Sequence, residues 1–282
     1  MTLPKLNDYV VFVDNLDHPE GVTWGPDGHV YAGGEAGQIY CITLDGEVTE
    51  VGSTGGFILG LCLDAQANVY ACDLNHKAVM RITPAGEVST YSSGAPERKL
   101  AVPNYPVFDA QGNLYVSDSG DWKGNNGCLF RIRPGGSTGV LTSELSQFPN
   151  GLALSPDGAY LYVVLSNTAS VVRAALDEDG GIGPPETVVE LPKTVPDGLA
   201  FDALGNLYIS CYTPDIVYRL SSGGDLQVVV EDWESTLIAS PTNIAFAGAD
   251  LSTLVVASLS RWHLAKAQLP VVGQPLHYPD LS

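Results

Sequence analysis

The chain has 282 residues, of which 45% are hydrophobic and 16% charged, with 31 Gly and 19 Pro. This composition provides enough apolar material for a core and excludes disordered, collagen-like and coiled-coil proteins. The net charge of −19, from 13 basic and 32 acidic residues, argues against nucleic acids and anionic membranes as partners, because both require a basic patch, and favours cations.

The N-terminal residues and the cysteines predict a cytoplasmic protein. No apolar run approaches the roughly 18 residues of a membrane helix, and the first residues lack the basic start and apolar middle of a signal peptide. The cysteines are odd in number and show no Cys-x-x-Cys spacing, which predicts reduced thiols without a disulfide or zinc framework. They are Cys41, Cys62, Cys72, Cys128 and Cys211.

A turn followed by a tyrosine-containing strand recurs along the chain. A short apolar strand precedes each turn, as in 151–154, and a third strand follows, as in 38–43. A fourth strand completes most repeats, as in 226–230. The copies of the turn and its strand lie at 26–31, 65–70, 110–115, 156–162 and 203–208, with a degenerate copy at 248–255.

Alignment of the repeats brings six residues into one register at intervals of 39, 45, 46, 47 and 45 residues. Four short strands at this spacing are typical of a propeller blade. We therefore predict an all-β fold: a single six-bladed β-propeller domain over residues 1–282, with four antiparallel strands per blade. Segment 8–13 precedes the first blade, and we expect it to complete the last blade and close the ring.

The residues in this register predict a metal site. In a propeller the first strand of each blade lines the axis, so these side chains form a ring around it. The ring comprises Glu20, Leu59, Asn104, Asn150, Asp197 and Thr242. Two carboxylates brought together repel each other unless a cation or proton compensates. Oxygen ligands suit a hard divalent cation, and Ca²⁺ is favoured because it tolerates irregular geometry.

A second interpretation of the same residues remains open. Asn-Gly and Asp-Gly pairs such as Asn150-Gly151 and Asp197-Gly198 are also hairpin-turn signals. Each repeat already has a hairpin turn a few residues later, as at Asp157-Gly158. Spacing alone does not distinguish the metal ring from a second turn.

Four segments of the chain resemble the SMP-30/gluconolactonase/LRE family of six-bladed propellers. The segments are 18–21, 148–158, 195–202 and 240–246. The resemblance covers about 16–264 and implies a divalent-metal hydrolase, usually a lactonase acting on a small molecule, with Ca²⁺ or with Zn²⁺, Mn²⁺ or Mg²⁺. It also implies Glu20, Asn150 and Asp197 as metal ligands, Asp197 as general base, and Asn104 close to both metal and substrate.

The third blade departs from the pattern of the sugar-lactone members. An arginine often stands two residues before the third-blade asparagine, where this chain has Val102, and Tyr105 replaces an acidic residue. This departure puts a carbohydrate lactone in doubt and favours a less polar substrate. Arg98 and Lys99 lie nearby and are interpreted as loop residues that solvate the surface.

The implied chemistry is metal-assisted ester hydrolysis, with Asp197 as general base on water. Metal-bound hydroxide is the alternative nucleophile, and the sequence does not separate the two. Four aromatic residues are expected in inter-strand loops, either lining a substrate pocket or packing between blades: Tyr105, Trp122, Phe148 and Tyr212.

We expect the histidines, and the aspartates at strand ends, to be structural or solvent-exposed residues. His18 could move a proton but is interpreted as structural, and His76 and His263 have no visible partner in the sequence. Asp73 and Asp118 end second strands, where they either approach the cation or are solvated.

Two other classes of function fit the same fold. One is a non-enzymatic propeller that binds a ligand or partner, because propellers host many functions. The other is a metal-dependent lyase or isomerase, because a cation also stabilises an enolate. No Gly-x-Ser-x-Gly elbow, P-loop or dinucleotide fingerprint occurs, which argues against serine hydrolases and nucleotide-dependent enzymes.

Overall fold

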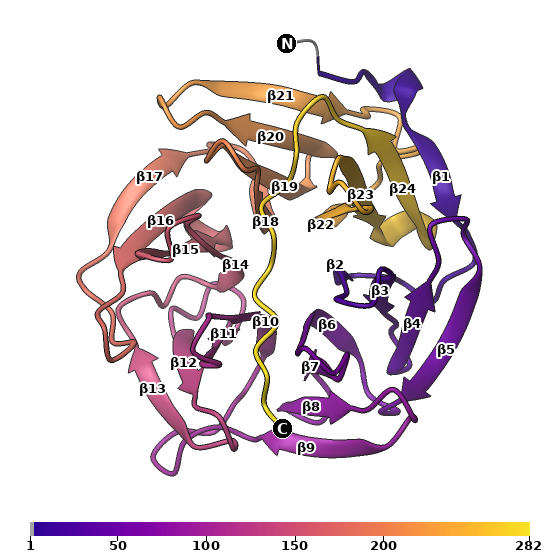
Figure 1. Cartoon of the computed structure of the whole chain (residues 1–282). Coiled ribbons are helices and arrows are strands. Elements are labelled where there is room, and N and C mark those ends of the chain that lie inside the picture. The colour runs from indigo at the N-terminus through magenta and orange to yellow at the C-terminus, as the bar shows by residue number, and fades with distance from the viewer. Residues whose placement is uncertain (1–2) are drawn as a thin grey trace.

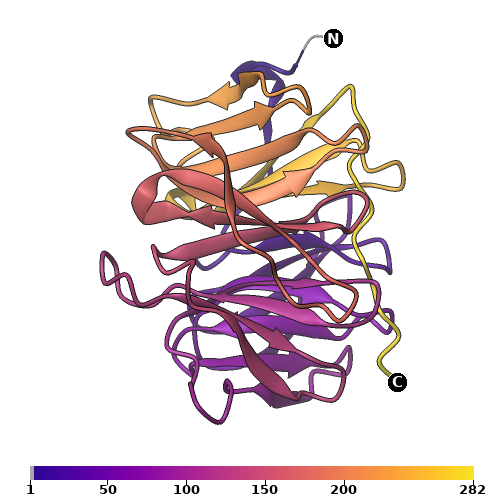
Figure 2. The same cartoon turned by 90° about the vertical axis from the view of Figure 1, so that its left-hand side faces the viewer.

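The computed structural model describes residues 3–282 as six antiparallel sheets arranged around a central axis (Figures 1 and 2). Each sheet has four strands, which confirms the predicted six-bladed β-propeller. The helical segments are single 3₁₀ turns, η1 (Leu6–Asp8), η2 (Ser166–Thr168) and η3 (Leu259–Arg261). Over residues 3–282 we find no helix with the length and apolar character needed to cross a membrane.

The strands of each blade follow one another in the chain from the axis outward. Blade 1 contains β2 (Val22–Trp24), β3 (Val30–Gly33), β4 (Gln38–Ile42) and β5 (Val48–Ser53). Blade 2 contains β6 (Ile58–Leu63), β7 (Val69–Asp73), β8 (Ala78–Ile82) and β9 (Val88–Ser92). Blade 3 contains β10 (Pro103–Phe108), β11 (Leu114–Asp118), β12 (Cys128–Ile132) and β13 (Thr138–Thr142).

The second half of the chain repeats this order. Blade 4 contains β14 (Pro149–Leu154), β15 (Tyr160–Leu165), β16 (Ser170–Ala175) and β17 (Glu186–Glu190). Blade 5 contains β18 (Val195–Phe201), β19 (Leu207–Thr213), β20 (Ile216–Leu220) and β21 (Leu226–Glu231). Blade 6 contains β22 (Pro241–Ala247), β23 (Thr253–Ser258) and β24 (His263–Gln268).

The N-terminal strand closes the ring. β1 (Val10–Val13) pairs antiparallel with β24 and becomes the outer strand of blade 6, with Val10 opposite Lys266 and Val11 opposite Ala265. Its pairing satisfies the backbone groups that would otherwise leave the outer edge of β24 open. The prediction that the segment 8–13 closes the propeller is confirmed.

The recurrent tyrosine has a packing role and a hydrogen-bonding role. Tyr70 of blade 2 packs edge-on against Phe108 of blade 3, with ring centroids 5.0 Å apart, and Tyr208 packs in the same way against Phe246. The Tyr70 hydroxyl donates to the buried carboxylate of Asp64, which also accepts the backbone N–H of Asn68. One side chain thus fixes the hairpin of its own blade and fills the space before the next.

Glycines follow four of the six ring residues because the inner strands approach one another closely. A Cβ atom on Gly151 would lie 2.2 Å from the main-chain oxygen of Asp197, and one on Gly198 would lie 2.7 Å from that of Thr242. Both glycines lie inside strands β14 and β18. The alternative interpretation of these Asn-Gly and Asp-Gly pairs as hairpin turns is therefore wrong, because glycine is required here by interstrand distance.

The C-terminal segment crosses one face of the propeller (Figure 1). It forms a strap, defined here as residues 274–282, which touches blades 1, 2 and 5. The N–H of Gln274 donates to Phe201, the hydroxyl of Tyr278 to the carbonyl of Trp24, and the N–H of Ala65 to Pro279. The strap covers an apolar cavity of about 80 Å³ at this end of the channel, lined by the second halves of the inner strands.

Tyr278 is the strap residue whose removal we expect to weaken the fold most clearly. It is half-buried, packs against the core between blades 1 and 2, and donates a 2.7 Å hydrogen bond. Tyr278→Ala should lower the free energy of unfolding by about 2 kcal/mol. The exposed Val272 provides the control, since Val272→Ala should change it by less than about 0.5 kcal/mol. Equal effects of the two substitutions in urea denaturation would contradict this role of the strap.

Candidate metal centre

The six predicted ring residues all lie at one end of the inner strands. Glu20 precedes β2, and the other five occupy the first half of β6, β10, β14, β18 and β22. Five are nearly inaccessible, with exposures of 2–8%: Leu59, Asn104, Asn150, Asp197 and Thr242. Neighbouring inner strands are in direct contact, and the Thr242 hydroxyl donates 2.8 Å to the carbonyl of Glu20 to join blade 6 to blade 1. We call this end of the channel the hub.

Serine hydroxyls fix the orientation of the two hub asparagines. The Asn150 Nδ2 group donates to Ser166 Oγ at 3.3 Å, and Ser166 Oγ donates its own hydrogen to the carbonyl of Pro196 at 2.7 Å. Ser119 makes the same pair of bonds, from Asn104 Nδ2 and to the carbonyl of Pro149. Because each hydroxyl hydrogen is already used, the serine can only accept from the amide, so each Nδ2 faces the serine and each Oδ1 faces away.

One consequence is an unsatisfied acceptor at the hub. The buried Oδ1 atom of Asn150 has no hydrogen-bond partner among the described residues. Leaving a buried polar atom unpaired costs about 1–3 kcal/mol, and such atoms are rare in folded proteins. An oxygen held in this way by its own amide group is suited to coordinate a cation.

The two carboxylates of the hub are forced to share a buried site. Burial and the nearby charge of Glu20 raise the pKa of Asp197 well above its usual range, and the Asn150 amide partly offsets this. Burial likewise raises the pKa of Glu20. Both shifts mean that two ionised carboxylates are unfavourable at the hub without a positive charge.

The donor set fits a hard divalent cation. Glu20 and Asp197 provide carboxylate oxygens, and Asn150 provides an amide oxygen without another partner. Ca²⁺ accepts such mixed oxygen ligands, with water in the remaining positions. Leu59 supplies no ligand, and the hydroxyl hydrogen of Thr242 is bound to the main chain.

Tyr105 lies between the hub and the apolar cavity. It belongs to strand β10, so its predicted position in an inter-strand loop is wrong. Its hydroxyl donates across the channel to Asn243 Oδ1 of blade 6, at 3.4 Å, and its ring lines the apolar cavity. Burial raises the pKa of Tyr105 to about 12, so the phenol stays neutral at physiological pH. Tyr105 thus separates the polar hub from the apolar half of the channel.

The other predicted aromatic residues lie on the hub side of the propeller. Trp122 is 50% exposed and stands edge-on to Phe148, with centroids 4.9 Å apart. Both belong to loops, as predicted, and Phe148 stands two residues before Asn150. Tyr212 is exposed but lies in strand β19, so its predicted loop position is wrong. Trp122 and Phe148 form an apolar rim beside the hub.

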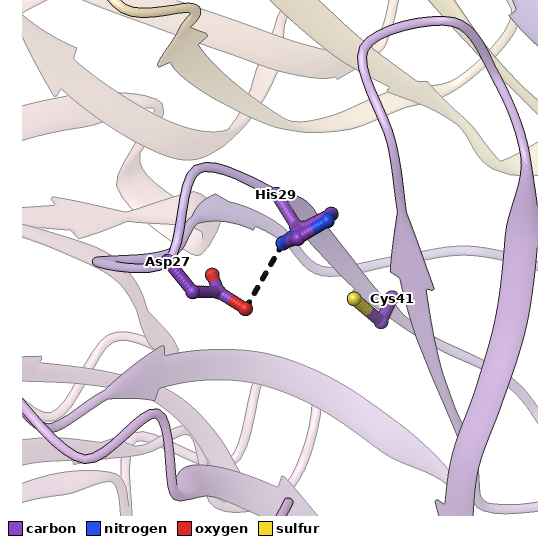
Figure 3. A group of neighbouring side chains, drawn as sticks. All are labelled: Asp27, His29 and Cys41. Carbon is purple, nitrogen blue, oxygen red and sulfur yellow. Dashed lines mark ion pairs between the residues drawn. The ribbon is translucent and has the colours of Figure 1, made fainter.

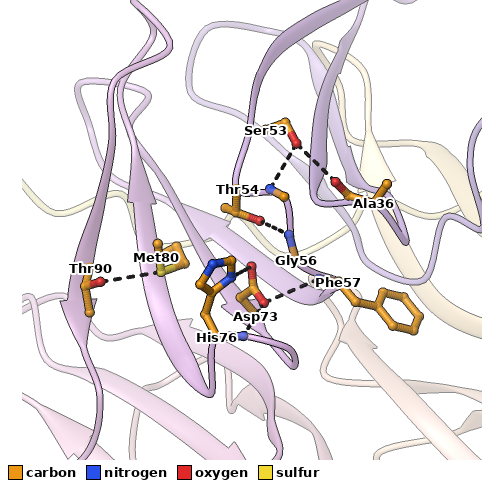
Figure 4. A network of polar contacts seen from close by, with 10 residues as sticks. Ala36, Ser53, Thr54, Gly56, Phe57, Asp73, His76, Met80 and Thr90 are labelled. Carbon is orange, nitrogen blue, oxygen red and sulfur yellow. Dashed lines mark hydrogen bonds and ion pairs between the residues drawn. The ribbon is translucent and has the colours of Figure 1, made fainter.

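Asp73 and His76 form a pair (Figure 4). His76 Nδ1 lies 2.9 Å from Asp73 Oδ2, and Asp73 Oδ1 accepts the backbone N–H groups of His76 and Phe57. No partner for His76 was visible in the sequence, and the structure shows that Asp73 is its partner. Asp73 is fully buried and holds together two loops of blade 2, so its solvated interpretation is wrong.

Asp118 and His263 also hold loops in place. The Asp118 carboxylate accepts the N–H groups of Ala101, Val102 and Gly120, which fixes the segment leading to Asn104. It is buried, and burial raises its pKa while these hydrogen bonds lower it. The Nε2 atom of His263 lies 2.7 Å from the carbonyl of Leu237. Both residues therefore have partners that the sequence did not reveal.

His18 lies near the entrance to the first inner strand. Its Nδ1 atom is 2.5 Å from Glu35, and its ring stacks at a tilt against Trp262 with centroids 4.4 Å apart. These contacts hold the loop before Glu20, in agreement with the structural role expected for His18.

Ser119 and Ser166 are the functional residues that sequence reasoning missed. Each stands immediately after a second strand, β11 or β15, and each bonds a hub asparagine and the inner strand of the next blade. Both serines occupy the same position in the repeat, directly after the second strand, and this shared position could have indicated a common role. A serine after a strand is too frequent to indicate one by itself.

The raised pKa values predict how pH affects the metal-free protein. The unfolded chain ionises both carboxylates near pH 4, whereas the folded hub retains protons to higher pH. The folded state therefore binds more protons, so stability falls as pH rises. In EDTA, the free energy of unfolding should fall by about 1–2 kcal/mol between about pH 5.5 and about pH 8.

Glu20→Gln should reduce this pH dependence, because it removes one of the two carboxylates, and saturating Ca²⁺ should have the same effect. The exposed Asp225 lies in the turn before β21, away from the hub, so Asp225→Asn should leave the pH dependence unchanged. Urea denaturation at both pH values measures it. If the free energy of unfolding depended on pH as steeply in Glu20→Gln as in the unsubstituted protein, repulsion between Glu20 and Asp197 would not be its cause.

Curated proteins match parts of this chain. A 6-deoxy-6-sulfogluconolactonase of Pseudomonas putida is 35% identical over 137 residues, which are 48% of this chain and 45% of the relative. A gluconolactonase of Zymomonas mobilis is 27% identical over 201 residues, 64% of this chain and 54% of the relative. Regucalcin of Xenopus laevis is 32% identical over 141 residues, 48% of this chain and 44% of the relative. The matches span about half the length of these relatives.

Solved structures share the fold over nearly the whole chain. A gluconolactonase from Xanthomonas campestris has a TM-score of 0.80 at 21% identity, covering 93% of this chain and 89% of its own. The calcium-binding protein regucalcin from Agrobacterium tumefaciens has a TM-score of 0.79 at 18% identity, covering 100% and 99%. The sequence model of the SMP-30/Gluconolactonase/LRE-like region matches residues 18–260. The chain belongs to the SMP-30/gluconolactonase/LRE-like family.

Proposed function

We propose that this protein is a divalent-metal-dependent lactonase that opens a small cyclic ester at the hub, with Ca²⁺ as the preferred cation. The observation that carries the proposal is that the carboxylates of Glu20 and Asp197 lie near each other and near the unpaired Oδ1 atom of Asn150. Lactonase relatives in the same family support the reaction class, and the regucalcin likeness supports calcium.

The proposed ligands are Glu20, Asn150 and Asp197, with Asn104 beside them. When bound, a divalent cation supplies positive charge that polarises the lactone carbonyl and stabilises its developing negative charge. Asn104 is positioned by Ser119, so its amide oxygen is held ready to orient substrate or water.

Asp197 is the proposed general base. A neighbouring positive charge lowers the pKa of a carboxylate and keeps it ionised at neutral pH. Burial and Glu20 act in the opposite direction, so Asp197 retains more basicity than a solvated carboxylate would in the same position. The ionised side chain would accept a proton from the attacking water.

Asp197→Asn tests the assigned base. The amide keeps an oxygen at the hub but cannot accept a proton, so kcat should fall at least about 100-fold on the best substrate of a lactone panel. The parent should lose activity in EDTA and recover it with Ca²⁺. Asp225→Asn changes a carboxylate of the same blade far from the hub and should leave kcat unaltered. Substantial hydrolysis by Asp197→Asn would exclude the aspartate as base.

We further propose that the substrate is less polar than a sugar lactone. Val102 stands where sugar-lactone members often carry arginine, and the rim beside Asn150 consists of Trp122 and Phe148. Arg98 lies near this loop, but its guanidinium is bonded to the carbonyl of Asn126 and to Ser143. These contacts favour an apolar substituent over a hydroxylated one.

Trp122→Ala tests the rim. Loss of an aromatic contact worth about 1.4 kcal/mol should raise KM about tenfold for a lactone with an apolar substituent. KM for gluconolactone should change much less. Trp233 is 83% exposed, and Trp233→Ala is the matched control that should change neither value. Equal changes in KM for both lactones would contradict the apolar preference.

A further inference from the structure

Three side chains of different chemistry meet on blade 1, at the end opposite the hub (Figure 3). Asp27 and His29 belong to the turn between β2 and β3, and Cys41 lies near the end of β4. Each offers one donor atom, and these three atoms lie within 4.8 Å of one another. The proposed hydrolysis does not use this group, which we call the blade 1 cluster.

The geometry inside the cluster is unusual for a hydrogen bond. His29 Nδ1 lies 3.0 Å from Asp27 Oδ2. Yet this Nδ1 atom is buried and has no hydrogen-bond partner within residues 3–282. Two ligands on one tetrahedral zinc are separated by about 3.3 Å, and their lone pairs point at the metal and not at each other. The observed approach of nitrogen and oxygen matches that arrangement.

The surrounding residues hold the ligands in place. The Tyr31 hydroxyl donates to Asp27 Oδ2 at 2.8 Å, and Tyr31 pairs with Cys41 across β3 and β4. Hydrogen bonds of this kind to a ligating carboxylate orient it and support metal affinity. The side chains remain reachable from solvent, since His29 is 36% and Asp27 is 34% exposed.

From these observations we propose that Asp27, His29 and Cys41 form a second metal site, which takes a thiophilic divalent cation such as Zn²⁺. Sulfur, imidazole and carboxylate are the ligands that zinc uses, and water completes the tetrahedron. Binding converts the Cys41 thiol to a thiolate and releases one proton to solvent. The site differs from the hub in chemistry, because the hub offers only oxygen ligands.

Co²⁺ absorption tests the cluster without interference from the hub. A thiolate bound to Co²⁺ gives a near-ultraviolet charge-transfer band, which oxygen ligands cannot produce. The parent protein in excess Ca²⁺ should develop this band with Co²⁺ and lose it when Zn²⁺ is added. Cys41→Ser should abolish the band. Cys62→Ser, which removes the other partly accessible cysteine, should retain it.

Thiol alkylation provides an independent measurement. Zn²⁺ should slow alkylation of Cys41, measured by peptide mass spectrometry, at least about tenfold, because the bound sulfur no longer acts as a free thiolate. His29→Ala should lose most of this protection. An unchanged alkylation rate in the parent with Zn²⁺, or a charge-transfer band that persists in Cys41→Ser, would overturn the proposal. Lactone hydrolysis is read separately, and Cys41→Ser should not change it.

Discussion

The close approach of six inner strands to one axis is the constraint on which the molecule depends. Gly151 and Gly198 exist because a side chain at either position would collide with the main chain of the next blade. The same approach leaves the residue before each glycine facing its counterparts around the axis. A packing requirement of the backbone therefore places the Glu20 and Asp197 carboxylates and the Asn150 amide in one confined volume, where only a positive charge relieves the repulsion.

The asparagines of the hub are fixed by contacts between blades. Ser119 and Ser166 each connect a hub amide to the inner strand of the following blade. The orientation of the hub oxygens is thus tied to the relative position of neighbouring blades, so a change in blade packing would displace these oxygens directly. This coupling preorganises the site before any ligand arrives.

The sequence predicted the large features well because they repeat. The tyrosine-containing strands revealed the six blades, and the common register located Glu20, Asn104, Asn150 and Asp197 at one end of the inner strands. Because the pattern occurs six times, it can be recognised even where one copy departs from it. The family resemblance then implied roles that spacing alone left open.

What the sequence did not predict depends on contacts that no repeat encodes. Tyr105 was expected in a loop, yet its hydroxyl reaches a residue 138 positions away. The partners of Asp73 and His263 lie in loops of irregular length, which differ from blade to blade. The blade 1 cluster combines a turn with a later strand in a single blade, so neither periodicity nor a spacing motif could reveal it, and cysteine spacing argued against zinc.

The C-terminal strap and Tyr105 together affect how a small molecule reaches the hub. The strap and the ring of Tyr105 line the cavity on the side away from the hub, so they narrow access to the hub from that side. A molecule that binds at the hub would then enter and leave from the opposite side, between the loops. In the proposed hydrolysis, the opened acid would have to leave before the next lactone enters, and accumulating product would compete with substrate for that route.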